Sequence, residues 1–148
     1  GTTWSNMIEN TTWKVSGHTT YAVTPKAMYT VEITNATKTY GPENGTSKIG
    51  LMYVSDYGFA AATSAWTSNM SDYYSSAITS VNWMYMSYNE WTITPDSLDR
   101  FNVFYASSRG LYSGRTYFEY GARPVLYLKS SVAYAGGSGT QSDPIIIN

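Results

Sequence analysis

The residues that could carry out acid–base chemistry are few in this chain of 148 residues. His18 is the single histidine and lies in a predicted turn, which is typical of an exposed loop residue rather than a catalytic base. The carboxylates Asp56, Glu90, Asp96 and Glu119 are the candidates for a glycosidase pair. Such a pair must lie about 5–10 Å apart across a cleft. The sequence does not reveal one, so a carbohydrate-active enzyme is an alternative hypothesis rather than the first.

Metal and cofactor chemistry finds little support in the sequence. The chain has no cysteine, which excludes disulfides, thiolate metal sites and cysteine nucleophiles. Asp72, Asp96 and Asp99 lack the spacing of a calcium-binding loop. The glycine-rich segment 136–139 follows a predicted strand but opens no helix, so we expect no phosphate-binding site there. We therefore predict a non-enzymatic protein with no metal and no cofactor.

The composition indicates one β-rich domain over residues 1–148. Charged residues make up 13% of the chain and the net charge is −1, so we expect no nucleic-acid partner. No apolar run approaches the roughly 18 residues of a membrane span, so we expect no direct membrane insertion. Fifteen tyrosines and five tryptophans with so little charge are typical of secreted or surface-exposed β-rich domains.

The strongest strand pattern in the chain is segment 121–129. The apolar side chains from Val125 to Leu128 run unbroken after Pro124, which predicts a strand buried on both sides at the centre of the fold. Pro124 suits the first position of such a strand because it cannot donate a ladder hydrogen bond. The residues expected to hold the frame are apolar: Leu51, Val54, Trp83, Trp91, Val125 and Leu128.

Shorter strands are predicted elsewhere. In segment 29–34 the apolar residues alternate with Thr30, Glu32 and Thr34, which predicts a half-buried strand with a polar outer face. Further strands are expected at 11–15, 49–58, 81–84, 90–94, 101–105 and 145–147. The expected fold class is α+β and β-rich, with short helices and long loops.

Several of these segments together resemble a known family. The motifs are Ile49-Gly50-Leu51, Asn82-Trp83, segment 90–95 and Arg123-Pro124-Val125. They are similar to the ligand-binding domains of bacterial and phage surface proteins, which have a C-type lectin fold of the formylglycine-generating-enzyme-like variety. The resemblance implies a frame made by the Ile-Gly-Leu strand and the terminal Gly-x-Arg-Pro strand, with Arg123 bonded to carbonyl or carboxylate groups. It also implies an anchoring, pilin-like segment ahead of the domain, whereas formylglycine chemistry would need the cysteines that this chain lacks.

Some members of that family are variable proteins of diversity-generating retroelements, whose binding residues are mutated near the C-terminus. Tyr, Ser, Asn, Asp and Gly, which such mutation produces, concentrate in segments 85–89, 96–102 and 105–120. Tyr also offers a large amphipathic contact area at low entropic cost, and Arg can form bidentate contacts. The predicted ligand-binding surface comprises Tyr85, Ser87, Tyr88, Asn89, Asp96, Asp99, Arg100, Tyr105, Ser107, Arg109, Tyr112, Arg115, Tyr117, Phe118 and Tyr120.

The sequence therefore predicts an extracellular recognition or adhesion module, displayed on a cell, a pilus or a virion. Its expected partner is a protein or glycan ligand on another cell or surface. A structural pilin or minor-pilin subunit is the second hypothesis, in which the aromatic surface would contact the next subunit. The simplest alternative is a β-rich protein with ordinary aromatic loops.

Overall fold

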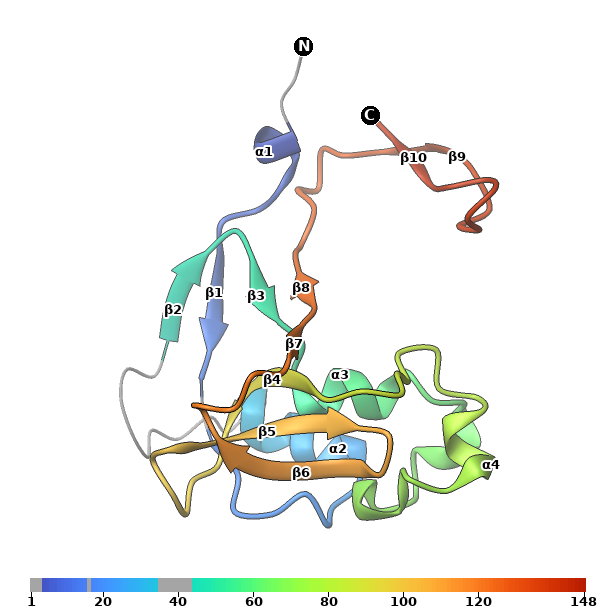
Figure 1. The fold of residues 1–148 in the computed structure, drawn as a ribbon. Coiled ribbons are helices and arrows are strands. Elements are labelled where there is room, and N and C mark those ends of the chain that lie inside the picture. Colours follow the sequence, from blue (N-terminus) through green and yellow to red (C-terminus); the bar gives the residue numbers. More distant parts are fainter. Residues whose placement is uncertain (1–3, 16, 35–43) are drawn as a thin grey trace.

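The largest sheet of the computed structural model, which describes residues 4–15, 17–34 and 44–148, has four strands (Figure 1). The strand order is β6-β5-β4-β7. Strands β4, β5 and β6 are antiparallel neighbours, and β7 runs parallel to β4. Their bounds are Glu90–Pro95 (β4), Asn102–Ser107 (β5), Gly110–Arg115 (β6) and Gly121–Ala122 (β7). The strands predicted at 90–94 and 101–105 are confirmed, and the chain is α+β.

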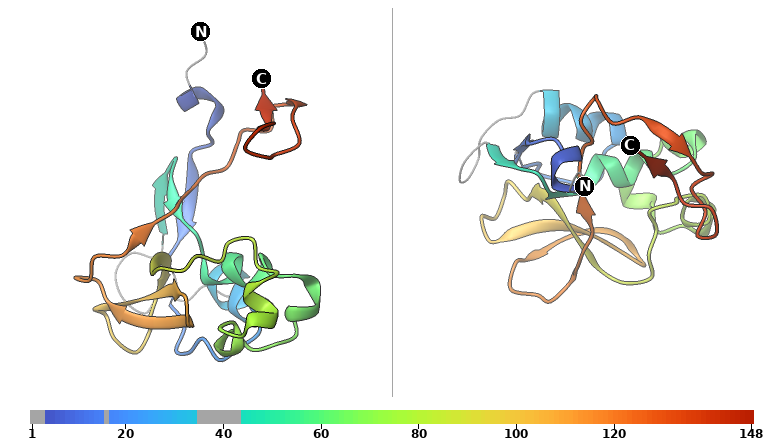
Figure 2. Two further views of the ribbon diagram at one scale, coloured as in Figure 1. Left: turned by 45° about the vertical axis from the view of Figure 1, so that its right-hand side comes forward. Right: turned by 90° about the horizontal axis from the view of Figure 1, so that it is seen from above.

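Two short helices cover the inner face of this sheet, α2 (Pro25–Tyr29) and α3 (Val54–Phe59) (Figures 1 and 2). The sheet contributes Phe104 and Leu111 to the core between them, and the helices contribute Met28, Val54 and Tyr57. The inward side of β4 is unusual because its buried residues are polar. Because side chains alternate along a strand, the apolar side chains of β4 lie on the opposite face of the sheet.

Helix α2 begins with a local signal. The Thr24 hydroxyl accepts a hydrogen bond from the backbone N–H of Ala27 at 3.3 Å, and Pro25 occupies the first turn. The helix continues as a π-helical turn, Thr30–Thr34, and Met28 and Glu32, four residues apart, are both fully buried. The strand predicted over 29–34 is therefore wrong, because the helix-start signal outweighs the alternating pattern.

The strand predicted over 49–58 is also shorter than expected. Only β3 (Gly50–Leu51) is extended, and α3 begins directly after Tyr53. The backbone N–H of Tyr53 donates to a carboxylate oxygen of Asp56 at 2.9 Å, which stabilises the first turn of the helix. A local capping interaction thus converts a strand-like sequence into a helix.

Short helices and turns fill the rest of segment 60–89. They are η2 (Thr63–Ala65), η3 (Met70–Asp72) and α4 (Ser76–Thr79). No strand forms at 81–84, where Asn82 makes an isolated bridge with Ala61 and its side-chain amide donates to the Tyr57 carbonyl at 3.0 Å. The predicted strand at 81–84 is wrong because the buried Asn82 side chain, rather than a neighbouring strand, forms hydrogen bonds with the backbone of this segment.

An arm of paired segments extends from the sheet, and the C-terminus lies at its far end (Figures 1 and 2). The predicted strand at 11–15 is confirmed, and the last short strand also forms. The pairs are all antiparallel: β1 (Thr11–Lys14) with β2 (Asn44–Ser47), β3 with β8 (Pro124–Val125), and β9 (Tyr134–Gly136) with β10 (Ile146–Ile147). Helix α1 (Trp4–Met7) lies at the N-terminal end of the arm.

The predicted central strand at 121–129 is wrong. It divides into β7 and β8, and Leu126, Tyr127 and Leu128 are 41%, 49% and 43% exposed. The chain leaves the sheet here and pairs with the N-terminal segment instead, since the Lys129 N–H donates to the Met7 carbonyl at 2.9 Å. A pair of strands by itself leaves both of its faces open to solvent. The apolar run at 126–128 is therefore not buried.

Of the expected frame residues, Val54 is fully buried, and Leu51, Trp91 and Val125 are partly buried. Trp83 and Leu128 are exposed, so their assignment to the frame is wrong.

In the part of the chain that the structure describes, no helix combines the length and apolar character needed to cross a membrane.

Candidate functional site

The outward face of the sheet carries a row of aromatic side chains. Trp91 on β4 is the direct cross-strand partner of Tyr105 on β5, and Tyr105 is the partner of Tyr112 on β6. Their ring centroids lie 5.7 and 5.9 Å apart, within the range of attractive aromatic pairs. Alternation along each strand places them opposite the core, because Phe104 and Leu111, their sequence neighbours, are buried.

The connection from β6 to β7 extends this row. The Tyr120 ring lies 4.7 Å from both Trp91 and Tyr105. Phe118 stacks on Tyr120 at 5.6 Å, and Tyr117 contacts Phe118 at 4.7 Å. We call the contiguous set the aromatic face; it comprises Trp91, Tyr105, Tyr112, Tyr117, Phe118 and Tyr120.

The aromatic face is open to solvent at its ends. Tyr117 is 72% exposed, Phe118 42% and Tyr112 36%, whereas Tyr105 and Tyr120 are half-buried by their neighbours. Burial, reinforced by a hydrogen bond with Tyr120, raises the pKa of Tyr105 to about 12. The hydroxyl of Tyr105, like that of an ordinary tyrosine, is protonated at neutral pH and can act as a hydrogen-bond donor.

Gly114 makes room for the central ring of the aromatic face. It pairs with Val103 and lies on the same side of β6 as Tyr112. A Cβ atom at this position would lie 2.9 Å from Cε1 of Tyr105 and 3.8 Å from Cδ2 of Phe118. The position of the Tyr105 ring thus depends on the absence of a side chain at residue 114.

A polar cleft of about 370 Å³ adjoins the aromatic face at the β5–β6 turn. We call it the hairpin cleft. It is lined by Asn89, Tyr105, Ser107, Ser108, Arg109 and Tyr112. Arg109 is exposed and, within the described residues, makes no ion pair. The cleft therefore combines aromatic walls with a cation that is available to a ligand.

The turn that shapes this cleft is fixed by its own hydrogen bonds. The Ser107 hydroxyl accepts from the Arg109 N–H and donates to the Gly110 carbonyl, both at 3.0 Å. Gly110 adopts φ +100°, a left-handed conformation that favours glycine. Ser107 is 7% exposed and its hydroxyl is engaged in the turn, so it supports the shape of the cleft, and its role as a ligand contact stays a prediction.

A second cleft, of about 290 Å³, lies beside the first. Tyr74 lines it together with Ser108, Arg109 and Tyr112. Neither Tyr74 nor Ser108 was among the predicted site residues, and Trp91 was predicted for the frame rather than for the binding surface. Trp91 carried a signal, because its alternation with Glu90, Thr92 and Thr94 places it on the other face of β4.

The remaining predicted site residues divide into groups. Tyr85, Ser87 and Tyr88 precede β4; Tyr88 is 54% exposed and its ring approaches Gly121. Arg100 and Arg115 are exposed at the end of the hairpin away from the hairpin cleft. Arg115 is on the opposite side of β6 from Tyr112, and Arg100 lies 4.7 Å over the Phe101 ring. The structure therefore does not place them on the aromatic face.

The predicted aspartates belong to turns. Asp96 is 9% exposed and accepts hydrogen bonds from the Leu98 N–H at 2.9 Å and from the Ser113 hydroxyl at 2.5 Å. Both hydrogen bonds hold the turn, and a ligand contact by Asp96 stays a prediction. Asp99 is partly buried, and one of its carboxylate oxygens accepts a hydrogen bond from the Phe101 N–H at 2.9 Å. This bond caps the start of β5, so that oxygen is less available to a ligand.

The other candidates for chemistry are also engaged. The Arg123 guanidinium donates to Glu90 at 2.6 Å and to the Met84 carbonyl at 3.0 Å, as expected for a structural arginine. Burial lowers the pKa of His18, whose Nδ1 accepts from the Thr20 N–H at 3.0 Å. Within residues 4–15, 17–34 and 44–148 no cluster of acidic and histidine side chains could hold a metal ion.

Comparisons of the chain with protein-family models, with curated proteins and with solved structures found no match.

Proposed function

We propose that this protein is a recognition module that binds a macromolecular ligand, a protein or a glycan, through the aromatic face and the hairpin cleft. The observation that carries the proposal is the cross-strand row Trp91–Tyr105–Tyr112 on the sheet face opposite α2 and α3, which no helix of the described residues covers (Figure 1). Contiguous exposed aromatic side chains are uncommon on a monomer and usually mark an interaction site.

The chemistry of the surface suits binding. Tyr, Trp and Arg dominate binding hot spots because they combine large apolar area with a polar group. The rings also hold one another in place: Tyr105 contacts Trp91, Tyr112 and Tyr120 at 4.7–5.9 Å. A surface that is already ordered loses less conformational entropy when a ligand binds.

A C-type lectin-like frame is part of this proposal. It is supported by the direct pairing of β3 with β8, in which Gly50 is opposite Val125 and Leu51 is opposite Pro124. The Ile-Gly-Leu and Arg-Pro-Val motifs therefore meet, as the resemblance implies. Display on a cell, pilus or virion and diversification by a retroelement belong to the same proposal. A reverse-transcriptase gene and a near-identical template repeat for segment 85–120 in the neighbouring DNA would support diversification.

The alternative functions have weaker support. A pilin subunit would use the aromatic face against its next copy, and concentration-dependent assembly would reveal it. A carbohydrate-active enzyme would need two free carboxylates facing one cleft. Glu90 is paired with Arg123, and Asp96 is held by Leu98 and Ser113, so these carboxylates already have partners.

The test compares two triple variants. Tyr112→Ala, Tyr117→Ala and Phe118→Ala remove exposed rings of the aromatic face. Trp4→Ala, Tyr134→Ala and Ile146→Ala remove side chains on the arm that are 72%, 67% and 56% exposed, and they form the matched control.

Labelled proteins are applied to an immobilised glycan array and to a panel of bacterial and eukaryotic cells. We expect the wild-type protein and the arm variant to bind the same targets, and the aromatic-face variant to lose at least about tenfold in affinity. Equal binding by both variants, with folding verified by circular dichroism, would refute the proposal.

A further inference from the structure

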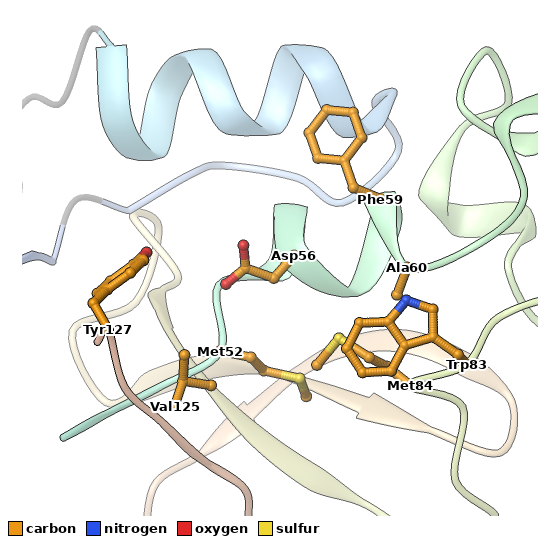
Figure 3. A pocket seen from close by; sticks show the side chains of 8 residues that line it. All are labelled: Met52, Asp56, Phe59, Ala60, Trp83, Met84, Val125 and Tyr127. Carbon is orange, nitrogen blue, oxygen red and sulfur yellow. The ribbon is translucent and has the colours of Figure 1, made fainter. Parts of the chain in front are cut away.

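We propose that a second site, separate from the aromatic face, binds a small organic cation: an ammonium group that carries apolar substituents. The site is a pocket of about 330 Å³ beside α3 (Figure 3). It is lined by Met52, Asp56, Phe59, Ala60, Trp83, Met84, Val125 and Tyr127. This volume lies at the low end of the range for ligand pockets, which favours a small molecule.

One acidic side chain faces an otherwise apolar wall in this pocket. Figure 3 shows the carboxylate of Asp56 among the side chains of Met52, Val125 and Tyr127. One Asp56 oxygen accepts the Tyr53 N–H at 2.9 Å, and the other has no hydrogen-bond partner in the described part of the chain. No cation of residues 4–15, 17–34 and 44–148 lies within 4 Å of it either. A partly buried carboxylate without a counter-charge is unfavourable, and a bound cation would stabilise it.

The pocket walls favour a cation over a neutral molecule. Trp83 and Tyr127 contribute aromatic side chains to the lining, and the faces of aromatic rings attract ammonium groups. Met52 and Met84 contribute polarisable sulfur atoms that adapt to an apolar substituent. Trp83 is 77% exposed, an unusual state for a tryptophan, and a ligand in the pocket would cover part of its ring.

Asp56 is positioned independently of any ligand. It lies in the first turn of α3, and its hydrogen bond with the Tyr53 N–H holds the carboxylate at the edge of the pocket. The Asp56→Asn variant keeps an oxygen for that hydrogen bond and removes only the negative charge. The contribution of the charge can therefore be measured without displacing the helix.

The experiment titrates choline and its neutral carbon isostere, 3,3-dimethylbutan-1-ol, into the protein. Binding is followed by calorimetry and by the NMR signal of the Trp83 indole N–H. We expect choline to bind at least about tenfold more tightly than the isostere. Asp56→Asn should lower the affinity for choline by about tenfold or more and leave the isostere unaffected, and Trp83→Ala should weaken both. Asp72→Asn, an exposed change of the same charge, is the control and should change neither.

Three results would overturn the proposal. The first is equal binding, or no binding, of choline and the isostere. The second is wild-type affinity for choline in both Asp56→Asn and Trp83→Ala. The third is binding of a lysine-containing peptide without binding of choline, which would assign the pocket to a polypeptide partner instead of a small molecule. The aromatic face shares no residue with this pocket, so these outcomes do not affect its proposed function.

Discussion

Replacing Glu32 by Gln tests how the fold holds a buried carboxylate at the start of α3. Glu32 is fully buried and accepts hydrogen bonds from the backbone N–H groups of Val54 and Ser55, at 3.1 and 3.2 Å, and from the Thr94 hydroxyl. Burial is the largest influence and raises the pKa of Glu32 from 4.5 to about 7, although the hydrogen bonds from Ser55 and Thr94 act in the opposite direction.

The raised pKa makes stability depend on pH. Between pH 4.5 and about 7 the folded protein retains a proton on Glu32 that the unfolded chain has released. The stabilisation is complete below pH 4.5 and is lost as the pH rises through 7. At about 1.36 kcal/mol per pH unit, this interval corresponds to a loss of about 3 kcal/mol in the free energy of unfolding. The side chain at position 32 cannot ionise in Glu32→Gln, so the free energy of unfolding of this variant lacks this pH dependence.

The assay is urea denaturation of the wild type and Glu32→Gln at pH values from below 4.5 to above 7. We expect the wild-type free energy of unfolding, relative to that of the variant, to fall by about 3 kcal/mol across this range. The comparison cancels the titration of groups that do not interact with Glu32; Asp56, whose pKa burial also raises, raises the pKa of Glu32 and contributes to the measured difference. Glu119→Gln, an exposed change of the same kind, should show no such pH-dependent difference. A constant difference between wild type and Glu32→Gln, or one that grows with pH, would refute the reasoning.

Further variants test the fold and the site. Leu126→Asp should change the free energy of unfolding by less than about 1 kcal/mol, because Leu126 is 41% exposed; failure to fold in a thermal melt would restore the central-strand interpretation. Arg123→Met should cost about 3 kcal/mol in urea denaturation, because it leaves Glu90, whose side chain is 6% exposed, without its partner; adding Glu90→Gln should recover part of the loss. Gly114→Ala should displace the Tyr105 ring, which lies 2.9 Å from the new Cβ, and change the near-UV circular dichroism; an unchanged spectrum would show that the ring does not occupy this position.

The sequence predicted β4 and β5 of the sheet and β1 and β10 of the arm, but it did not predict β6. Segments 90–94 and 101–105 carry β-prone residues between turn residues, and both form strands. Segment 29–34 carries a similar alternation but becomes helical, because Thr24 and Pro25 start a helix just before it. The helix-start signal at Thr24 and Pro25 therefore distinguishes a helix from a strand in segment 29–34, which the hydrophobic pattern alone did not.

The structure brings together the central residues of the predicted binding surface but not those at its margins. Tyr105, Tyr112 and Tyr120 meet on one face, which their high frequency in segment 105–120 indicated. Asp96 and Ser107 have the composition of a contact surface, yet their side chains hold turns. Polar residues of the same type can bind a ligand or a backbone group, and composition does not distinguish the two.

The sequence by itself indicated that the chain is α+β and that aromatic side chains concentrate in segment 101–120, and the family resemblance implied a structural role for Arg123. Only the tertiary structure decided which aromatic residues share a surface, because that depends on the cross-strand register Trp91–Tyr105–Tyr112. It also decided that segment 126–128 is exposed, since burial depends on which elements cover a strand and not on the strand's own residues. The pocket at Asp56 has the same origin: its lining comes from α3, β8 and the loops at Met52 and Met84, which only the folded chain brings together.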